Sequence, residues 1–137
     1  MNSKDIGNLG EHIAIVELLK LNVRVSRPLG DNARYDLILE IGGILYTAQV
    51  KSTLVNKEDL VEFPLQSSQA HRGGSKQHYD VDMFILVDIP KNQVYLYFNL
   101  DRKTSVKLRY NYSEDIKYRA STWAKDHLLE KVICSLS

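Results

Sequence analysis

The sequence predicts an α/β (α+β) fold in which a mixed sheet is flanked by helices. Three observations predict it: a segment near the start has apolar residues at helical spacing, several short segments are alternating or wholly apolar, and an amphipathic segment lies near the other end. A length of 137 residues suits one domain over residues 1–137. We therefore expect a single domain built around one mixed sheet.

The expected elements follow in order from local signals. Residues 7–21 contain good helix formers without proline, and Asn22 is expected to end this helix. Five strands are expected where β-favouring or continuous apolar residues occur, at 23–27, 35–41, 44–53, 83–89 and 93–98. A second helix is expected from the spacing of its apolar residues, Leu128, Leu129, Val132, Ile133 and Leu136. Residues 54–80 are harder to assign, although 61–65 has the composition of a strand.

The composition excludes several classes of protein. Apolar residues make up 44%, charged residues 26% and the net charge is +1, which is typical of an ordinary globular chain and not of a polybasic nucleic-acid-binding tail. The single cysteine, Cys134, excludes a disulfide framework and a cysteine-based zinc site. The apolar runs are too short for a membrane span and the first residues are too polar for a secretory signal. We therefore expect a soluble, cytoplasmic protein with no membrane partner.

Gly42 and Gly43 are expected to form the tight turn of a β-hairpin. With that turn, Asp36 falls opposite Gln49, and Lys51 shares the face of Gln49 and lies diagonal to Asp36. The other face of the hairpin is expected to be core because it collects Tyr35, Leu37, Leu39, Ile41, Ile44, Tyr46, Ala48 and Val50. The face with the polar residues has two interpretations, a solvent-facing side of the sheet or a functional cluster.

The first helix favours the functional cluster. One arc of this helix is expected to press on the sheet, and its apolar members are Ala14, Ile15, Leu18 and Leu19. Glu11 falls inside the same arc, where a carboxylate is costly unless it is paired or binds a cation. Either the helix end frays into water at Glu11, or Glu11 points at the cluster formed by Asp36, Gln49 and Lys51.

Two carboxylates with an amide or backbone carbonyl form a hard, all-oxygen site of the kind that suits Mg²⁺, with Mn²⁺ as a substitute. A bound divalent ion polarises a phosphoryl oxygen and lowers the pKa of a bound water. Lys51 could orient that water or stabilise the charge that grows on the phosphorane. The cluster therefore predicts hydrolysis of a phosphodiester, without identifying the polymer.

These residues together resemble the PD-(D/E)XK nuclease superfamily. The resemblance is carried by Gly10-Glu11, Tyr35-Asp36 and Gln49-Val50-Lys51, with the loop Gly30-Asp31-Asn32, and covers residues 7–53 most clearly. It implies an αβββαβ core and divalent-metal-dependent cleavage of double-stranded DNA. By position, it implies that Glu11, Asp36, Gln49 and Lys51 are catalytic and that the metal ligands are Glu11, Asp36, Gln49 and the carbonyl of Val50.

The glutamine departs from the usual motif, in which the second ligand is Asp or Glu. Gln49 still offers a carbonyl oxygen but removes one negative charge, which Glu11 can supply. The Gln-Xaa-Lys variant resembles the branch that includes a group I intron-encoded homing endonuclease. That resemblance implies a site-specific, intron-homing endonuclease that assembles as a homotetramer, a dimer of dimers. A Holliday-junction resolvase-like nuclease and a catalytically inactive DNA-binding module are the alternatives.

Two polar stretches are candidates for DNA contact. Residues 66–78 are dense in short donors and cations, among which Gln69, Arg72 and Lys76 are the leading candidates. Residues 102–119 interleave basic and aromatic side chains, and here Lys107 and Arg109 are candidates for phosphate contact. Either stretch could instead be an ordinary polar surface.

Overall fold

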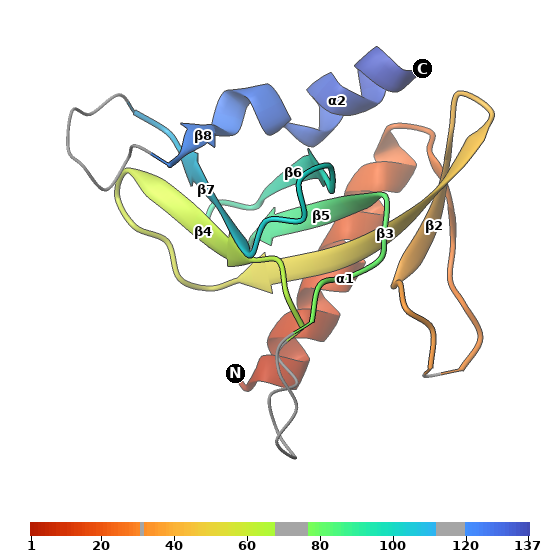
Figure 1. Cartoon of the computed structure of the whole chain (residues 1–137), viewed down its shortest axis with the longest axis horizontal. Coiled ribbons are helices and arrows are strands. Elements are labelled where there is room, and N and C mark those ends of the chain that lie inside the picture. The colour runs from red at the N-terminus through yellow and green to blue at the C-terminus, as the bar shows by residue number, and fades with distance from the viewer. Residues whose placement is uncertain (31, 68–76, 112–119) are drawn as a thin grey trace.

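The computed structural model describes residues 1–30, 32–67, 77–111 and 120–137 of the chain, and Figure 1 labels its main elements. In chain order these are α1 (Ser3–Lys20), β1 (Arg24–Ser26), β2 (Leu37–Ile41), β3 (Ile44–Thr53), β4 (Leu60–Pro64), β5 (Met83–Asp88), β6 (Gln93–Phe98), β7 (Ser105–Arg109), β8 (Thr122–Trp123), the 3₁₀ helix η3 (Ala124–His127) and α2 (Leu129–Leu136). The expected α/β class is confirmed. In the described part of the chain, no helix is long and apolar enough to cross a membrane.

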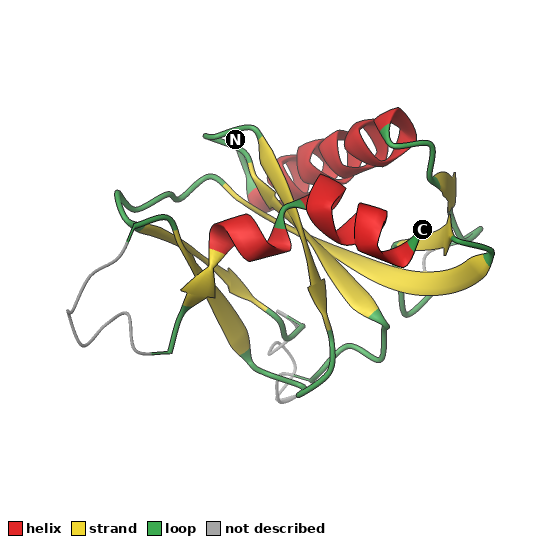
Figure 2. Cartoon of the chain, turned by 90° about the horizontal axis from the view of Figure 1, so that it is seen from above, coloured by secondary structure: helices red, strands yellow, loops and turns green. Residues whose placement is uncertain are grey.

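The strands form two sheets that enclose two cores. The first sheet has the order β1-β2-β3-β5-β6 and is mixed, because β3 and β5 are parallel and its other neighbours are antiparallel. The second has the order β4-β7-β8. Residues of α1 and α2 share one core with the first sheet, and residues of the second sheet share the other. Figure 2 views both helices from above. The first sheet is therefore the middle of three layers.

Strand β5 explains why one segment of the sequence is wholly apolar. All of its residues are buried, from Met83 to Asp88. Met83, Ile85 and Val87 contribute to the core beneath the helices, while Phe84 and Leu86 contribute to the core between the sheets. A strand that is covered on both faces has no solvent side on which to place polar residues.

The ends of α1 have identifiable causes. The side chain of Asn2 accepts a hydrogen bond from the backbone N–H of Asp5 at 2.9 Å, so the helix begins at Ser3 and not at residue 7 as expected. At the other end, Asn22 adopts a positive φ of 61°, a conformation that an α-helix cannot continue through. The expected termination at Asn22 is confirmed.

The hairpin has the register expected from its glycine turn. Gly42 and Gly43 both have positive φ, 60° and 80°, and Ile41 pairs with Ile44. The expected core face is wrong at two positions. Tyr35 packs in the core between the sheets, because regular pairing begins only at residue 37 and the alternation of faces does not reach it. Ile44 is 57% exposed because it lies beside the turn at the hairpin tip.

Three further differences separate the fold from the expectation. Strands β7 and β8 were not expected: β7 alternates buried Val106 and Leu108 with polar residues, but its segment was interpreted as a basic and aromatic surface, and β8 has only two residues. Leu19 is 55% exposed and does not press on the sheet, since α1 packs through the side that carries Gly10, Ala14 and Leu18. The expected order αβββαβ matches α1, β1, β2 and β3, and its last strand matches β5. Between β3 and β5, the described residues contain β4 in place of a helix.

Candidate active site

The polar cluster lies where β2 begins beside β3. The carboxylate of Asp36 accepts a hydrogen bond from the backbone N–H of Val50 at 2.9 Å, and the backbone N–H of Asp36 donates to the carbonyl of Ala48 at 2.9 Å. Burial raises the pKa of Asp36 above its ordinary value, while the Val50 N–H and the charges of Lys51 and Arg27 act in the opposite direction. A partly buried carboxylate of this kind gains from a nearby cation.

Gly10 brings the acidic residue of α1 to the same place. A Cβ at Gly10 would lie 2.3 Å from the Cβ of Ser52, so only glycine permits this close contact between α1 and β3. Ser52 also donates from its hydroxyl to the carbonyl of Ile6 at 3.2 Å. The next residue, Glu11, is thereby held beside the sheet with its side chain 26% exposed. The helix is therefore not frayed into water at Glu11, and the first of the two interpretations of this residue is wrong.

Two cavities meet at Asp36. The first, here called the Glu11 cavity, has a volume of about 390 Å³ and is lined by Glu11, Arg27, Pro28, Gly30, Ala33, Tyr35 and Asp36. The second, here called the Gln49 cavity, has a volume of about 560 Å³ and is lined by Ala33, Arg34, Asp36, Gln49, Ser67, Gln77, His78, Tyr79 and Asp80. Asp36 and Ala33 belong to both. The structure therefore brings Glu11, Asp36 and Gln49 to two adjoining cavities that share Asp36.

Lys51 is held by neutral groups. Its ammonium donates to the hydroxyl of Tyr79 at 3.0 Å and to the carbonyl of Gln66 at 3.3 Å, and it lies 4.5 Å from the centroid of the Tyr79 ring. Tyr79 makes an edge contact with Phe84, with ring centroids 6.2 Å apart. No carboxylate of the described residues lies within ion-pair distance of Lys51, although its charge acts on Asp36. The ammonium is thus fixed in direction by two neutral acceptors and one aromatic ring.

Two residues of this site were not assigned to the polar cluster from the sequence, although Arg27, with Arg24 and Arg34, was considered either to line the DNA side or to be an exposed strand edge. Arg27 donates to Glu11 from Nη2 to Oε1 at 3.1 Å and lines the Glu11 cavity. Tyr79 lines the Gln49 cavity and bonds Lys51. Arg27 was visible as one of several arginines near the hairpin, but no local pattern links it to Glu11. Tyr79 is separated from Lys51 by 28 positions, and only the fold brings them together.

The donor set fits a divalent cation. Asp36 and Glu11 supply carboxylate oxygens, and the side-chain amide of Gln49 has no hydrogen bond to any residue in the described ranges. These are the hard oxygen ligands that Mg²⁺ and Mn²⁺ prefer. Within residues 1–30, 32–67, 77–111 and 120–137 there is no group of three or more His, Cys, Asp or Glu side chains arranged for a metal. An ion at this site would therefore depend on the Gln49 amide and on backbone oxygen, such as the carbonyl of Val50.

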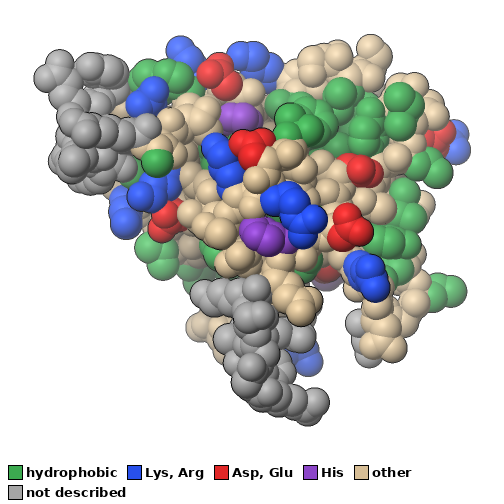
Figure 3. Space-filling model, in the orientation of Figure 1, with side chains coloured by type: hydrophobic (Ala, Val, Ile, Leu, Met, Phe, Trp, Pro, Cys, Tyr) green, Lys and Arg blue, Asp and Glu red, His purple; other side chains and the backbone are tan. Residues whose placement is uncertain are grey.

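The remaining candidate residues lie elsewhere. Lys107 and Arg109 are on β7 and line neither cavity: Lys107 lies 3.9 Å from a carboxylate oxygen of Glu62, and Arg109 lies 4.3 Å from the centroid of the Trp123 ring. Over the described part of the face in Figure 3, acidic and basic side chains lie side by side, in keeping with the small net charge. Three expected DNA contacts, Gln69, Arg72 and Lys76, lie outside the described residues, as does Asp31.

Comparison with known proteins identifies the family. A family model described as PD-(D/E)XK endonuclease matches residues 1–130. The chain belongs to the PD-(D/E)XK endonuclease family. Proteins of this family are nucleases that hydrolyse DNA and usually use divalent metal ions. The resemblance to the PD-(D/E)XK nuclease superfamily is confirmed at the level of the family.

A solved structure shares the fold of this PD-(D/E)XK endonuclease. The bacterial homing endonuclease I-Ssp6803I is 23% identical, with a TM-score of 0.71 over 88% of this chain and 86% of that chain. At this identity the likeness establishes a common fold. The search of curated proteins returned no significant match.

Proposed function

We propose that this protein is a site-specific endonuclease that hydrolyses phosphodiester bonds in double-stranded DNA with Mg²⁺, for which Mn²⁺ substitutes. The observation that supports this most strongly is that Asp36 lines both the Glu11 cavity and the Gln49 cavity, with the Lys51 ammonium charge acting on Asp36. The similarity in fold to a bacterial homing endonuclease supports a role in intron homing. Such a protein acts on the genome from the cytoplasm, as one nuclease domain over residues 1–137.

In this proposal the ligands of the ion are Glu11, Asp36, Gln49 and the carbonyl of Val50. When bound, the ion polarises the scissile phosphate and acidifies a water. Asp36 is fixed for this role by the Val50 N–H, so its carboxylate needs no reorganisation. Glu11 supplies the negative charge that a glutamine at position 49 does not. The ion pair with Arg27 occupies Oε1 of Glu11, which leaves Oε2 for the ion.

Lys51 carries the second catalytic role. Because its ammonium is bonded to a hydroxyl and a carbonyl and to no carboxylate of the described residues, its charge remains available to the phosphate. A fixed positive charge beside the reacting group stabilises the negative charge that develops in the transition state. Arg27 adds a guanidinium in the Glu11 cavity, which can bind a phosphate oxygen once it is released from Glu11.

The protein is proposed to bind DNA as a homo-oligomer, a dimer of dimers. A chain of this size has one such site, whereas cutting both strands of a duplex requires two, and symmetric assembly provides them. Phosphate and base contacts are proposed for Gln69, Arg72, Lys76, Lys107 and Arg109. The side chain of Lys107 is partly exposed and only loosely paired with Glu62, which leaves it able to contact phosphate.

The test compares Lys51→Ala with Lys57→Ala on a supercoiled plasmid library that carries random inserts. Lys57 is exposed and lines neither cavity, so it is the matched control. With Mg²⁺ we expect cleavage by the wild type and the control, a loss of more than about 100-fold for Lys51→Ala, and no cleavage in EDTA. Cleavage by Lys51→Ala at the wild-type rate, or none by the wild type with either Mg²⁺ or Mn²⁺, would contradict the proposal.

Two alternative functions have a specific observation in their favour. The acidic residue on α1 favours a nuclease similar to Holliday-junction resolvases, and a preference for four-way junctions over linear duplex in a gel assay would support it. Gln49 favours a catalytically inactive DNA-binding module. In that case the wild type fails to cleave with any divalent metal, and Gln49→Glu gains metal-dependent cleavage.

A further inference from the structure

The side of α1 that faces away from the sheet is unusually apolar for an exposed helix face. Leu9, Val16 and Leu19 are 37%, 50% and 55% exposed, although the opposite side of the same helix already supplies the core with Ala14 and Leu18. A surface helix normally has a polar outer face. No other described helix or strand lies against this side of α1 in Figure 2.

The exposed residues follow the spacing of a helix–helix contact. Asp5, Leu9, His12, Val16 and Leu19 are separated by alternating steps of four and three, which places them on one stripe, here called the outer face of α1. The ring of His12, in the middle of this stripe, is bonded to the carbonyl of Asn8 in the same helix at 2.7 Å. The other central residues, Leu9 and Val16, are apolar, and the acidic and basic side chains Asp5 and Lys20 lie at the two ends of the helix.

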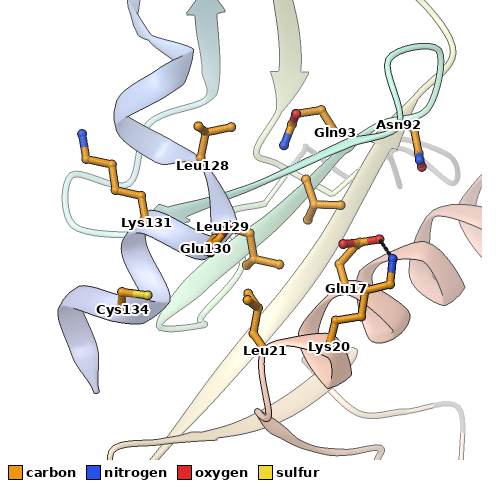
Figure 4. Close-up of a pocket in the computed structure, with 11 residues that line it drawn as sticks. Glu17, Lys20, Leu21, Asn92, Gln93, Leu128, Leu129, Glu130, Lys131 and Cys134 are labelled. Carbon is orange, nitrogen blue, oxygen red and sulfur yellow. Dashed lines mark hydrogen bonds and ion pairs between the residues drawn. The ribbon is translucent and has the colours of Figure 1, made fainter.

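The outer face is hollowed where an inserted side chain would fit. A small cavity of about 210 Å³ is lined by His12, Ile13, Val16, Glu17 and Asn92. It adjoins a groove of about 770 Å³ between α1 and α2, since Glu17 and Asn92 line both. Figure 4 shows the groove, with the ion pair of Glu17 and Lys20 on the α1 side. The C-terminal half of α1 therefore offers a concave surface next to an apolar stripe.

We propose that the outer face of α1 binds the same face of a second copy of this chain, with the two helices antiparallel. In that orientation Leu9 of each copy faces Val16 of the other, beside the small cavity, and Asp5 of each copy lies near Lys20 of the other. Lys20 can make this contact because its side chain is 66% exposed, despite its bond to Glu17 at 3.1 Å. A parallel pair would instead place Asp5 beside Asp5 and Lys20 beside Lys20.

A second copy fits this surface because the surface is complementary to itself. Acidic Asp5 is in the first turn of α1 and basic Lys20 is in the last, so a half-turn about the helix centre matches opposite charges and aligns the apolar centres. The helix has 18 residues, a contact about 27 Å long. This pairing would supply one of the contacts needed for a symmetric nuclease. It concerns self-association alone and stands whether or not the chain cleaves DNA.

Sedimentation or light scattering over a dilution series tests the assignment, using the full chain and the variant Val16→Glu. We expect the wild type to have at least twice the chain mass of 15.7 kDa, and Val16→Glu to lose at least half of the wild-type mass with an unchanged circular dichroism spectrum. The matched control is Leu29→Glu, because Leu29 is fully exposed and lies outside α1. A monomeric wild type, or an equal loss of mass in the control, overturns the proposal.

A charge exchange tests the antiparallel orientation. Asp5→Lys alone or Lys20→Glu alone puts like charges together across the pair, so each should weaken association. The double variant Asp5→Lys/Lys20→Glu restores opposite charges and should recover most of the wild-type association constant. If the double variant does not recover association, the antiparallel contact between two copies is wrong. The same result is expected if a different protein binds the outer face of α1.

Discussion

Two aspartates of the first sheet, one just before β2 and one at the end of β5, show how the same residue type can have different surroundings in this protein. Asp36 is half-buried, accepts one backbone hydrogen bond and borders two cavities. Asp88 is completely buried at the end of β5 and accepts hydrogen bonds from Asn56 at 2.7 Å and from Tyr110 at 2.5 Å. The first carboxylate keeps room for a ligand, and the second is enclosed by protein donors.

The region around Asp88 links the two sheets. Asn56 follows β3 in the first sheet, and Tyr110 follows β7 in the second. Burial, together with the hydrogen bond to Asp88, raises the pKa of Tyr110, and burial raises the pKa of Tyr95 to about 12. Both phenols therefore stay protonated, and the Tyr110 hydroxyl remains a donor to Asp88. The comparison indicates that Asp88 has its acceptors taken up by protein donors, whereas Asp36, with a single backbone donor, keeps room for a ligand.

The largest expected effect is the loss of cleavage in Asp36→Asn. If Asp36 is the metal ligand proposed above, removing its charge should lower the rate by more than about 100-fold, because mutation of residues that only hold a metal ligand in place already costs about 10–100-fold. Relaxation of supercoiled plasmid in Mg²⁺ measures the effect. Asp101→Asn is the control, since Asp101 is exposed and lines neither cavity.

The same Asp36→Asn protein should be no less stable than the wild type. Because burial raises the pKa of Asp36, the folded chain binds a proton more tightly than the unfolded chain, and the fold gains stability as the pH falls toward that pKa. At neutral pH the charge is therefore a cost to folding that asparagine removes. Thermal denaturation at pH 7 should show an equal or higher melting temperature; a clear decrease would mean that Asp36 serves the fold.

The second effect should be a loss of stability in Asp88→Ala. Without this carboxylate, the Asn56 amide and the Tyr110 hydroxyl lose their buried acceptor, which should lower the free energy of unfolding by about 2–5 kcal/mol. Urea denaturation measures it. Below the transition, the folded variant should cleave within a few-fold of the wild type, and a loss as deep as that of Asp36→Asn would place Asp88 in the catalytic machinery.

The smallest effect should come from Tyr79→Phe. This change removes the hydroxyl that accepts from Lys51 but keeps the ring beneath the ammonium, so the cleavage rate should fall on the order of tenfold. Single-turnover cleavage should show the loss in the chemical step with DNA affinity unchanged. The control is Tyr46→Phe, because Tyr46 lies on the same strand as Lys51 but on its opposite face, in the core beneath the helices. An equal loss of rate in the control would mean that Tyr79 has no special role.

Much of the candidate site could be predicted from local spacing. The two glycines at the turn set the register of the hairpin, which places Asp36 next to Gln49 and Lys51. The position of Glu11 on the buried arc of α1 indicated that it faces the sheet, and the ion pair with Arg27 shows how the chain compensates its charge. These inferences succeed because helix and strand periodicities are fixed by backbone geometry.

The second sheet could not be predicted in the same way. Strand β4 pairs with β7 from a distant part of the chain, and β7 pairs with the two-residue strand β8. Short strands of this kind are stabilised by their partners more than by their own composition. The exposure of Leu19 was also not predictable, because helix periodicity does not say how wide a stripe the sheet will cover.

Spacing along the chain was therefore enough to predict the α/β class, the hairpin register and the candidate site residues Glu11, Asp36 and Lys51. Tertiary packing alone decided that Arg27 neutralises Glu11, that Tyr79 holds Lys51, and that Asp88 joins the two sheets. The physical reason is the separation in sequence of the residues that interact. A turn or a helical face is specified by residues a few positions apart, whereas these contacts join distant residues that come within hydrogen-bond distance only when the sheets pack.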